Sequence, residues 1–491
     1  MGYLIGIDVG SQSVKAVLCS PDGKVIGTAA SPCSMSHPAS GWSEQNPHDW
    51  QTGIESTVRR VVADAAIAPE DVSHIGLGCQ VDGVVPIDER MRPLRDAIIW
   101  LDRRAIAQAA TMVERAGMDR IFAISGLNAD ASHIAPKIMW LRDEEPETYR
   151  AAHLLPPVGG FLTGWLTGRA VQDHANASST LLYDIRECAW SDELLDVTGV
   201  DPSLLAPIVP AHEPAGSLSP EVADALGLTT SCVVVTGTGD DHAATLGAGV
   251  ARPGTIVDVT GTAEPVTTVS LSPVFDAGRL VETHANAVDG TLLIENPGFV
   301  SGGSTAWLAQ ALGATQAEVF TWAEDAPAGS DGVIFVPALS GATAPRWNDR
   351  MRGAFYGLSM NHDRSHLGRA VLEGCAYALR DIVEQIGALG LGGSEIRVVG
   401  GGARSRSWTQ IKSDVTGIPV RPVLSPEPTA LGAAMLAAVA AGVFPDAVAA
   451  AEAMSKVSDE RYEPDAGHHE IYNRAYRTYR RLFDALEEVA M

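Results

Sequence analysis

The sequence predicts an α/β protein built from two domains of similar size, and three observations lead to this. The chain has 491 residues, whereas single hydrophobic cores stop growing at roughly 250–300 residues, so two cores are expected. Strand-like apolar runs alternate with helical stretches along both halves of the chain. A strand–turn–strand pattern also occurs near the start of each half, at residues 4–17 and 255–266.

Both of these turns consist of small and polar residues. The first, residues 10–13, reads Gly-Ser-Gln-Ser, and the second, residues 260–263, reads Thr-Gly-Thr-Ala. Glycine lets the backbone approach an anion closely, and nearby N–H and hydroxyl groups can donate to phosphate. An aspartate beside such a turn, as at Asp8, can hold Mg²⁺. Two such turns in paired domains predict a nucleotide held between the domains.

The remaining elements of the first half follow the same alternation. Apolar runs at residues 75–78 and 83–87 predict strands before a helix from about Asp102. The run at residues 231–235 predicts another strand, and a helix is expected from about Asp241. This order of elements is typical of α/β architecture.

In the second half, residues 333–336 and 396–399 are expected to form strands. A long helix is expected over residues 365–386, and another begins near Ser407. Glycines directly after the long helix are expected to end it, whereas Gly368 and Gly374 inside the helix indicate close packing against a neighbouring element.

We place the domain boundary in the glycine-rich stretch 247–254, which contains Pro253. This divides the chain into an N-terminal domain, residues 1–249, and a C-terminal domain, residues 250–491. The tail predicts an amphipathic helix that packs back on the body. Its apolar residues at helical spacing are Ile471, Ala475, Tyr479, Leu482, Leu486 and Val489.

Charge and cysteine content exclude several functional classes. The formal net charge of −25 repels nucleic acids and anionic membranes, so neither is expected as a partner. The six scattered cysteines include no CxxC pair, which indicates reduced thiols. The N-terminal apolar run is interrupted by Asp8, and the longest apolar run, residues 430–444, is shorter than the about 20 residues that a membrane span needs. We therefore expect a cytoplasmic enzyme.

The segment 233–242 carries the strongest chemical signal. An apolar strand ends in glycines and is followed by Asp240 and Asp241 at an expected helix start, a position where α/β proteins bind ligands. Either aspartate could simply be an N-cap. Together with two phosphate turns, however, Asp240 fits a carboxylate that orients a hydroxyl nucleophile and accepts its proton late in phosphoryl transfer.

Two further segments could contact ligands. Residues 398–405 place three glycines between a strand and a helix, where a base or ribose could lie against the backbone, although such runs are often only tight crossovers. Residues 80–83 and 100–104 offer carboxylates, an aromatic ring and basic groups to a polyhydroxylated ligand. Trp100 could equally belong to the core, and Arg103 or Arg104 to a surface ion pair.

Over nearly its whole length the chain resembles the FGGY carbohydrate kinases of the actin-like ATPase superfamily. Residues 353–358, Gly-Ala-Phe-Tyr-Gly-Leu, followed by residues 366–373, resemble the C-terminal signature of that family. The resemblance implies two ribonuclease-H-like (actin-like ATPase) domains flanking a cleft. It also implies that sugar binds mostly to the N-terminal domain and ATP mostly to the C-terminal domain, and that a homodimer is common.

The resemblance also implies roles for individual residues, with ATP and Mg²⁺ as cofactors. Asp240 corresponds to the catalytic base and Asp8 to the magnesium-associated carboxylate. The implied nucleotide-binding residues are Ser11, Gln12, Ser13, Lys15, Gly261, Thr262, Gly302, Gly401 and Gly402. The implied sugar-binding residues are Val81, Asp82, Trp100, Asp102 and Asp241.

The overall pattern is most similar to the xylulose kinases, but the substrate positions depart from it. Those enzymes usually have Met-His in place of Val81-Asp82, Asn in place of Leu101, and Asn in place of Asp241. A Gly-Glu-Arg-Thr-Pro-like loop is replaced by residues 341–345, Gly-Ala-Thr-Ala-Pro. We therefore expect a kinase acting on a primary hydroxyl of a small ketose such as D-xylulose, with a tetritol, pentitol or L-ketose as the alternative.

Two other classes of function compete with the kinase. One is a non-catalytic actin-like sensor of sugar or nucleotide, against which the intact Asp8 and Asp240 argue. The other is a chaperone-like ATPase, for which we would expect a long peptide-binding extension. The sequence favours the kinase.

Overall fold

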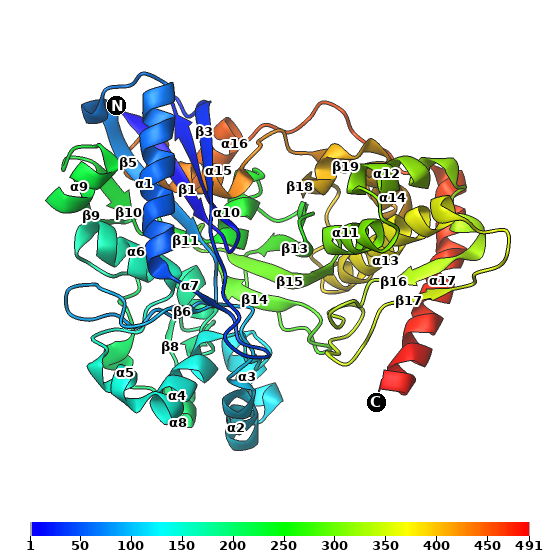
Figure 1. Ribbon diagram of the computed structural model, residues 1–491, viewed down its shortest axis with the longest axis horizontal. Coiled ribbons are helices and arrows are strands. Elements are labelled where there is room, and N and C mark those ends of the chain that lie inside the picture. Colours follow the sequence, from blue (N-terminus) through cyan, green and yellow to red (C-terminus); the bar gives the residue numbers. More distant parts are fainter. Residues whose placement is uncertain (1, 491) are drawn as a thin grey trace.

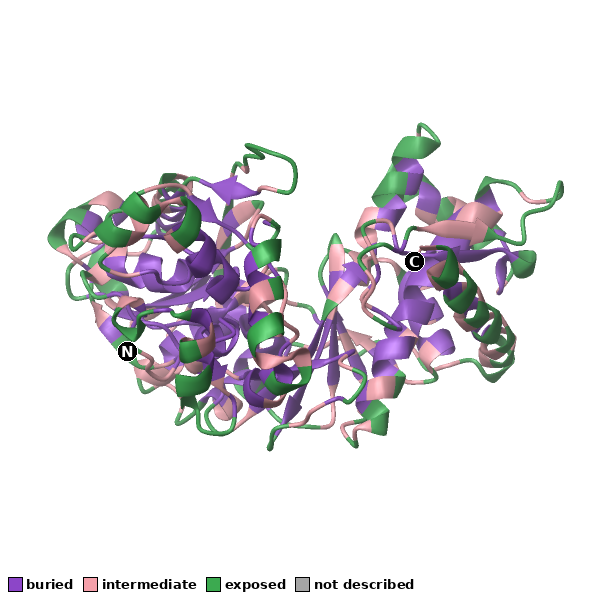
Figure 2. Cartoon of the chain, turned by 90° about the horizontal axis from the view of Figure 1, so that it is seen from below, coloured by how far each residue is buried: buried purple, intermediate pink, exposed green. Residues whose placement is uncertain are grey.

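The computed structural model describes residues 2–490, which form two α/β lobes, each built around one β-sheet (Figure 1). Strands in the middle of both lobes are mostly buried, and exposed residues lie on the surrounding helices and loops (Figure 2). The predicted α/β class with two domains is therefore confirmed. No helix within residues 2–490 combines the length and apolarity needed to cross a membrane.

The first lobe contains a seven-stranded sheet in the order β3-β2-β1-β5-β10-β9, with β11 also pairing with β5. Its strands are β1 (Tyr3–Val9), β2 (Ser13–Cys19), β3 (Val25–Pro32), β5 (Val72–Cys79), β9 (Pro214–Ser217), β10 (Val233–Val235) and β11 (Thr238–Gly239). The predicted first hairpin is the antiparallel pair β1 and β2, in which Asp8 lies opposite Lys15. Strand β1 also runs parallel to β5, so it is buried on both faces.

Helix α1 (Pro47–Asp64) packs against β2 and β3, and α15 (Pro428–Ala440) packs against β1 and β5. Glycines make the second contact possible: a Cβ atom on Gly6 would lie 1.9 Å from the Ala430 carbonyl oxygen, and one on Gly76 would lie 1.9 Å from that of Ala433. Only a residue without a side chain allows this approach.

After the second lobe, the chain therefore returns to cover the first sheet. Helix α16 (Ala447–Met454) packs on α15 and α10. The apolar run of residues 430–444 forms α15 and the turn after it rather than a longer helix. The boundary at residues 247–254 stays a prediction about where the two halves of the sequence divide.

The second lobe contains a six-stranded sheet in the order β14-β15-β13-β12-β18-β19. Its strands are β12 (Ile256–Val259), β13 (Ala263–Ser270), β14 (Glu282–Ala285), β15 (Leu292–Val300), β18 (Ile396–Val399) and β19 (Val420–Pro422). Hairpin β12–β13 repeats the β1–β2 hairpin, as the sequence predicts. The principal helices of this lobe are α11 (Gly302–Ala311), α12 (Gln316–Asp325), α13 (Arg364–Ala388), α14 (Arg406–Thr416) and α17 (Ala466–Ala490).

Shorter elements connect these layers. Helices elsewhere are α2 (Ile106–Ala116), α3 (Met118–Ser125), α4 (Ile134–Glu144), α5 (Pro146–Ala151), α6 (Val158–Thr167), α7 (His174–Ser178), α8 (Asp192–Thr198), α9 (Pro220–Leu226) and α10 (Asp240–Gly247). Two-stranded pairs are formed by β4 (Glu44–Gln45) with β6 (Ala97–Ile98), β7 (Tyr183–Asp184) with β8 (Ala189–Trp190), and β16 (Ile334–Val336) with β17 (Ala354–Tyr356). Single 3-10 turns are Pro69–Asp71, Pro202–Leu204, Ser330–Gly332 and Gly402–Arg404.

One predicted strand is wrong. Residues 83–87 form only isolated bridges at Val84 and Ile87. Pro86 within this run has no N–H group to donate to a ladder, so a regular strand is interrupted there. The prediction of close packing at Gly374 is confirmed, because a Cβ atom there would lie 2.3 Å from the Phe335 carbonyl oxygen.

The predicted amphipathic tail helix is confirmed as α17, and Ala475, Tyr479, Leu482 and Leu486 of the predicted stripe pack against the core. The buried residues of α17 are Tyr472, Tyr476, Tyr479 and Phe483. Val489, the last residue of the predicted stripe, is 85% exposed.

The predicted stripe does not include Tyr472 and Tyr476, whose hydroxyls are hydrogen-bonded in the core. The hydroxyl of Tyr472 donates to Glu373 at 3.0 Å, and that of Tyr476 donates to Asp381 at 2.5 Å. A buried tyrosine packs its apolar ring and also hydrogen-bonds its hydroxyl, so a search for aliphatic residues at helical spacing does not find it.

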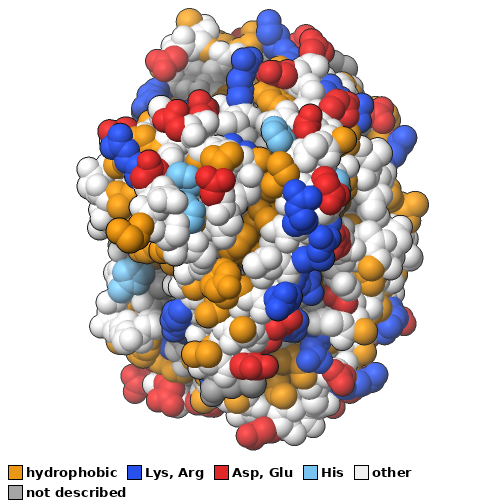
Figure 3. Space-filling model, turned by 90° about the vertical axis from the view of Figure 1, so that its right-hand side faces the viewer, with side chains coloured by type: hydrophobic (Ala, Val, Ile, Leu, Met, Phe, Trp, Pro, Cys, Tyr) orange, Lys and Arg blue, Asp and Glu red, His pale blue; other side chains and the backbone are white. Residues whose placement is uncertain are grey.

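The cysteine prediction agrees with the structure. All six cysteines are free thiols, and four of them are buried. The outer face of the second lobe carries acidic and basic side chains interspersed with apolar ones (Figure 3).

Candidate active site

Asp240 and Asp241 are the first two residues of α10, directly after β11. Gly239 is the N-cap of this helix, and no side chain caps it, so the simple N-cap interpretation of the two aspartates is wrong. The N–H of Asp241 donates to Oδ1 of Asp240 at 3.2 Å. Both carboxylates remain at the positive end of the helix dipole, where negative charge is stabilised.

Burial and like charges act together on Asp240. Its pKa lies well above the ordinary value, first because the carboxylate is half-buried and then because Asp241 and Asp8 are close. Burial also raises the pKa of Asp8 to about 7, although the nearby Lys15 opposes this rise. The structure thus brings the predicted catalytic base and the predicted magnesium carboxylate into one electrostatic cluster.

Lys15 links Asp8 to the start of α15. Its Nζ lies 3.7 Å from Oδ2 of Asp8 and 2.9 Å from Oε2 of Glu427. The Asp8 side chain keeps 12% of its surface exposed, so an ion can still reach it.

The donor set at Asp8 fits Mg²⁺. Mg²⁺ prefers oxygen ligands and is usually held by one or two carboxylates together with substrate phosphates. Within residues 2–490 no three His, Cys, Asp or Glu side chains are placed to hold a metal by themselves. Asp8, with Asp240 and Asp241 near it, offers carboxylate oxygens of the required kind.

Asp258, the aspartate of the second hairpin that corresponds to Asp8, has different surroundings. Asp258 is fully buried, and its Oδ2 lies 2.6 Å from Nζ of Lys412. Lys412 also lies 3.0 Å from Glu264. The second hairpin therefore neutralises its aspartate internally, and of the two aspartates only Asp8 lies in the cluster with Asp240.

Three backbone turns of the second lobe lie side by side. The N–H of Gly302 donates to the Gly261 carbonyl at 3.0 Å, and that of Gly402 donates to the Thr260 carbonyl at 3.2 Å. A Cβ atom on Gly302 would lie 2.3 Å from the Gly261 carbonyl oxygen. By contrast, a Cβ atom on Gly401 would meet nothing within 4 Å. The predicted nucleotide-binding glycines thus form one small-residue surface that is open at Gly401.

The turn of the first hairpin is held from outside by one glutamine. The Gln45 side chain donates to the Ser11 carbonyl at 2.8 Å, and the N–H of Gly10 donates to the Ser13 carbonyl at 3.1 Å. Gln12 is exposed. A turn fixed in this way can present its remaining polar groups without reorganising.

Asp82 has a left-handed backbone with φ of 61°. Buried Lys137 holds this conformation, because its ammonium group donates to the Asp82 carbonyl at 2.6 Å and to that of Ile99 at 2.9 Å. Nδ1 of His133 lies 3.1 Å from Oδ1 of Asp82. Burial alone would lower the pKa of His133, but the Asp82 carboxylate outweighs it, and the pKa rises to about 9.

Asp241 joins this region to the second lobe. Burial raises its pKa to about 6, although its hydrogen bond with Glu295 on β15 opposes the rise. The pKa of Glu295 lies well above the usual range because of burial and the neighbouring Asp241. Burial likewise raises the pKa of Glu282 to about 7. The two lobes thus meet where the side chains of Asp241 and Glu295 share a hydrogen bond.

Sequence reasoning missed four of these residues: His133, Lys137, Glu282 and Glu295. The one available signal is a carboxylate inside a mainly apolar strand, which occurs at Glu295 in β15 and indicates a buried role.

Asp102 and Trp100 are placed differently from the other predicted substrate residues. Asp102 is fully buried, accepts from the N–H of Ser43 at 2.6 Å, and pairs with Arg104 at 2.8 Å. Trp100 is 37% exposed, so it is not a core residue.

The expected surface ion pair is confirmed at Arg103, which pairs with Asp130. It is wrong for Arg104, whose side chain is 1% exposed and stacks 3.8 Å from the Trp42 ring centroid.

Known proteins are similar to this chain over nearly its whole length. A xylulose kinase from Staphylococcus epidermidis is 27% identical and aligns over 99% of this chain and 97% of its own length. A glycerol kinase from Agrobacterium fabrum is 32% identical over 94% of each chain. The crystal structure of a xyloylose kinase from Brucella ovis superposes with a TM-score of 0.90 at 28% identity, covering 99% of this chain and 100% of that chain.

Both halves also match a described family. Residues 3–247 match the N-terminal domain of the FGGY family of carbohydrate kinases, and residues 257–441 match its C-terminal domain. The two ribonuclease-H-like, actin-like ATPase domains implied by the resemblance accord with these matches. The chain therefore belongs to the FGGY family of carbohydrate kinases and is a sugar kinase.

Proposed function

We propose that this kinase transfers the γ-phosphoryl group of ATP to a primary hydroxyl of a small neutral ketose, with D-xylulose as the leading substrate. The observation that carries the proposal is the half-buried Asp240 carboxylate at the start of α10, next to Asp8. Phosphoryl transfer needs a group that positions the hydroxyl and takes its proton, and donors that neutralise phosphate charge. Asp240 is placed for the first task, and the small-residue turns for the second.

Asp240 orients the substrate hydroxyl and accepts its proton as the bond to phosphorus forms. Its raised pKa makes it a stronger base than an ordinary carboxylate. The turns at Ser11–Ser13 and Gly261–Thr262 donate to the phosphates, and Gly302, Gly401 and Gly402 leave room for the nucleotide. Mg²⁺, which Asp8 would hold, neutralises charge on the phosphates.

The substrate side favours a neutral polyhydroxylated ligand. Carboxyl groups at Asp82, Asp241 and Glu295 accept hydrogen bonds from hydroxyls but would repel the carboxylate of a sugar acid. Relatives named xylulose kinase and glycerol kinase are consistent with such a ligand. A tetritol, pentitol or L-ketose is the alternative, because Asp82 replaces the Met-His pattern of xylulose kinases.

The test is sugar-dependent release of ADP from MgATP in a coupled assay. The panel contains ketopentoses, ketohexoses, tetritols, pentitols, glycerol and gluconate. We expect a neutral ketose or polyol to stimulate turnover and gluconate to be inactive. Stimulation by gluconate alone would contradict the substrate class, and ATP binding without stimulation by any compound would favour the sensor hypothesis.

Replacing Asp82 by His should change which sugar is preferred. Histidine tolerates the left-handed backbone at this position, but it replaces an acceptor with a group that Lys137 and His133 would repel when charged. We expect the ratio of kcat/KM values between two sugars of the panel to change by about ten- to hundredfold. The exposed Asp64→His variant is the matched control, and an unchanged ratio in D82H would remove Asp82 from the specificity contacts.

Replacing Asp241 by Asn should move the acidic limb of the pH–rate profile to lower pH. The Asp241 carboxylate helps to raise the pKa of Asp240, so its removal lowers that pKa, and Asp240 stays deprotonated at lower pH. The expected shift of the kcat/KM profile is on the order of one pH unit. Asp64→Asn should leave the limb in place; an unshifted limb in D241N would show that Asp241 does not act on the base.

A further inference from the structure

The distribution of lysines in this chain is unusual. The chain contains five lysines among its 35 basic residues. Three have buried or paired ammonium groups: Lys15 pairs with Asp8 and Glu427, Lys137 donates to backbone carbonyls, and Lys412 pairs with Asp258 and Glu264. The other two, Lys24 and Lys456, line the same pocket although they come from opposite ends of the chain.

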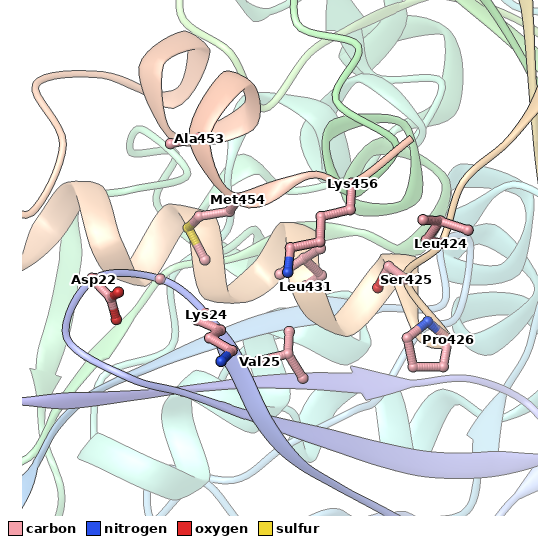
Figure 4. Close-up of a pocket in the computed structure, with 11 residues that line it drawn as sticks. Asp22, Lys24, Val25, Leu424, Ser425, Pro426, Leu431, Ala453, Met454 and Lys456 are labelled. Atoms are coloured by element: carbon pink, nitrogen blue, oxygen red, sulfur yellow. The ribbon is translucent and has the colours of Figure 1, made fainter. Parts of the chain in front are cut away.

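This pocket lies between the turn that joins β2 to β3 and the segment that leads into α15 (Figure 4). Its volume is about 290 Å³. The Lys456 side chain extends across the opening toward Leu431 and the strand that carries Lys24 (Figure 4). An apolar wall is formed by Val25, Leu424, Pro426, Leu431 and Met454.

Neither ammonium group is held in an ion pair within the described part of the chain. Across residues 2–490, neither Lys24 nor Lys456 has an ion pair or a side-chain hydrogen bond. Asp22 is the one acidic residue of the lining; its carboxylate accepts from the Ser20 hydroxyl and also interacts electrostatically with Lys24, so the lining holds two cations against one anion. In a chain with net charge −25, the pocket is therefore a local site of positive charge beside an apolar wall.

We propose that this pocket binds a small phosphate ester. A dianionic phosphate would pair with both lysines, and the carbon body would lie on the apolar wall. The volume is at the lower limit of small-molecule sites, about 300 Å³, so the body has few carbons and is not a dinucleotide. The site is separate from the cluster around Asp240.

The pocket has a direct connection to the candidate active site. Leu424, Ser425 and Pro426 line it, and the next residue, Glu427, holds Lys15 at 2.9 Å. Lys15 in turn lies 3.7 Å from Asp8. A ligand that shifts residues 424–426 would alter the charge beside Asp8, so we infer that occupancy changes the affinity for MgADP. This coupling, unlike the binding itself, rests on the proposed kinase function.

The binding test uses phenyl phosphate, whose ring probes the apolar wall, and titration calorimetry on the full chain. The double variant K24M/K456M should bind it at least tenfold more weakly, because both charge-assisted contacts are lost. The control R477M/R481M removes two exposed cations from α17 and should bind normally. Equal affinity in both double variants, or no binding to the native chain at 10 mM, would overturn the proposal.

A second variant tests the cavity without changing its charge. Ala453 lines the pocket, so Ala453→Phe should weaken phenyl phosphate binding to a similar extent, and retained binding would place the ligand elsewhere. For the coupling, phenyl phosphate should change the Kd of MgADP at least twofold in the native chain and not in Glu427→Gln. An unchanged Kd despite binding would refute the coupling alone, whereas failure of the kinase proposal would be seen independently as absence of sugar-stimulated turnover.

Discussion

Replacing Asp240 by Ala will lower kcat by roughly 10²–10⁴-fold, the range expected when a general base is lost. The carboxylate is half-buried beside Asp241 and Asp8, and desolvation together with these like charges raises its pKa. Asp240 is the first residue of α10. No neighbouring side chain occupies this position, so none can take over the positioning of the hydroxyl. MgATP binding should remain within a few-fold of native, because the phosphate contacts come from the turns and Asp8.

Two measurements separate this prediction from a folding defect. Titration calorimetry with MgADP should give a similar Kd for the native chain and for Asp240→Ala. Thermal unfolding of the isosteric Asp240→Asn variant should show equal or higher stability, because one of several neighbouring like charges is removed. Near-normal turnover in Asp240→Ala would remove this residue from the mechanism, and loss of MgADP binding would show that the site itself had collapsed.

The repeated hairpins could be predicted from sequence because each is local. Glycine and hydroxyl residues at a turn between two apolar runs determine a strand–turn–strand unit without reference to the rest of the chain. What could not be predicted is that the two hairpin aspartates differ. Asp8 lies near Asp240, whereas Asp258 is paired with Lys412, which lies far from it in the sequence. That distinction depends on where α14 packs, and no local pattern specifies this.

The substrate side was predicted less completely for the same reason. Asp82 and Asp241 stand out next to glycines at strand and helix ends, whereas His133 and Glu295 come from a helix border and a strand of the other lobe. Their roles arise only when α10 meets β15 through the Asp241 and Glu295 hydrogen bond. Similarly, the apolar run of residues 430–444 is informative in the sequence only as too short for a membrane span; that it packs on the first sheet over Gly6 and Gly76 depends on the folded arrangement.

The second large effect is expected at Lys412, which neutralises the second hairpin. Its ammonium group is 2.6 Å from Asp258 and 3.0 Å from Glu264, and all three side chains are almost fully buried. Removing one member of a buried ionic group leaves uncompensated charge, which costs about 3–5 kcal/mol. We expect Lys412→Met to lower the thermal unfolding temperature by roughly 6–20 °C.

The pH dependence of this loss identifies its cause. Burial and the neighbouring Asp258 already raise the pKa of Glu264 to about 8, and without Lys412 the pKa should rise further. Glu264 then stays protonated in the folded variant above pH 8, where the native chain releases this proton, so the stability lost in Lys412→Met should grow as the pH rises above 8. The triple variant K412M/D258N/E264Q, which removes the charges together, should recover much of the loss and show a weaker pH dependence. A loss in K412M that is independent of pH and persists in the triple variant would instead assign it to packing of the lysine stem against Trp408, whose ring centroid lies 4.9 Å from the ammonium nitrogen.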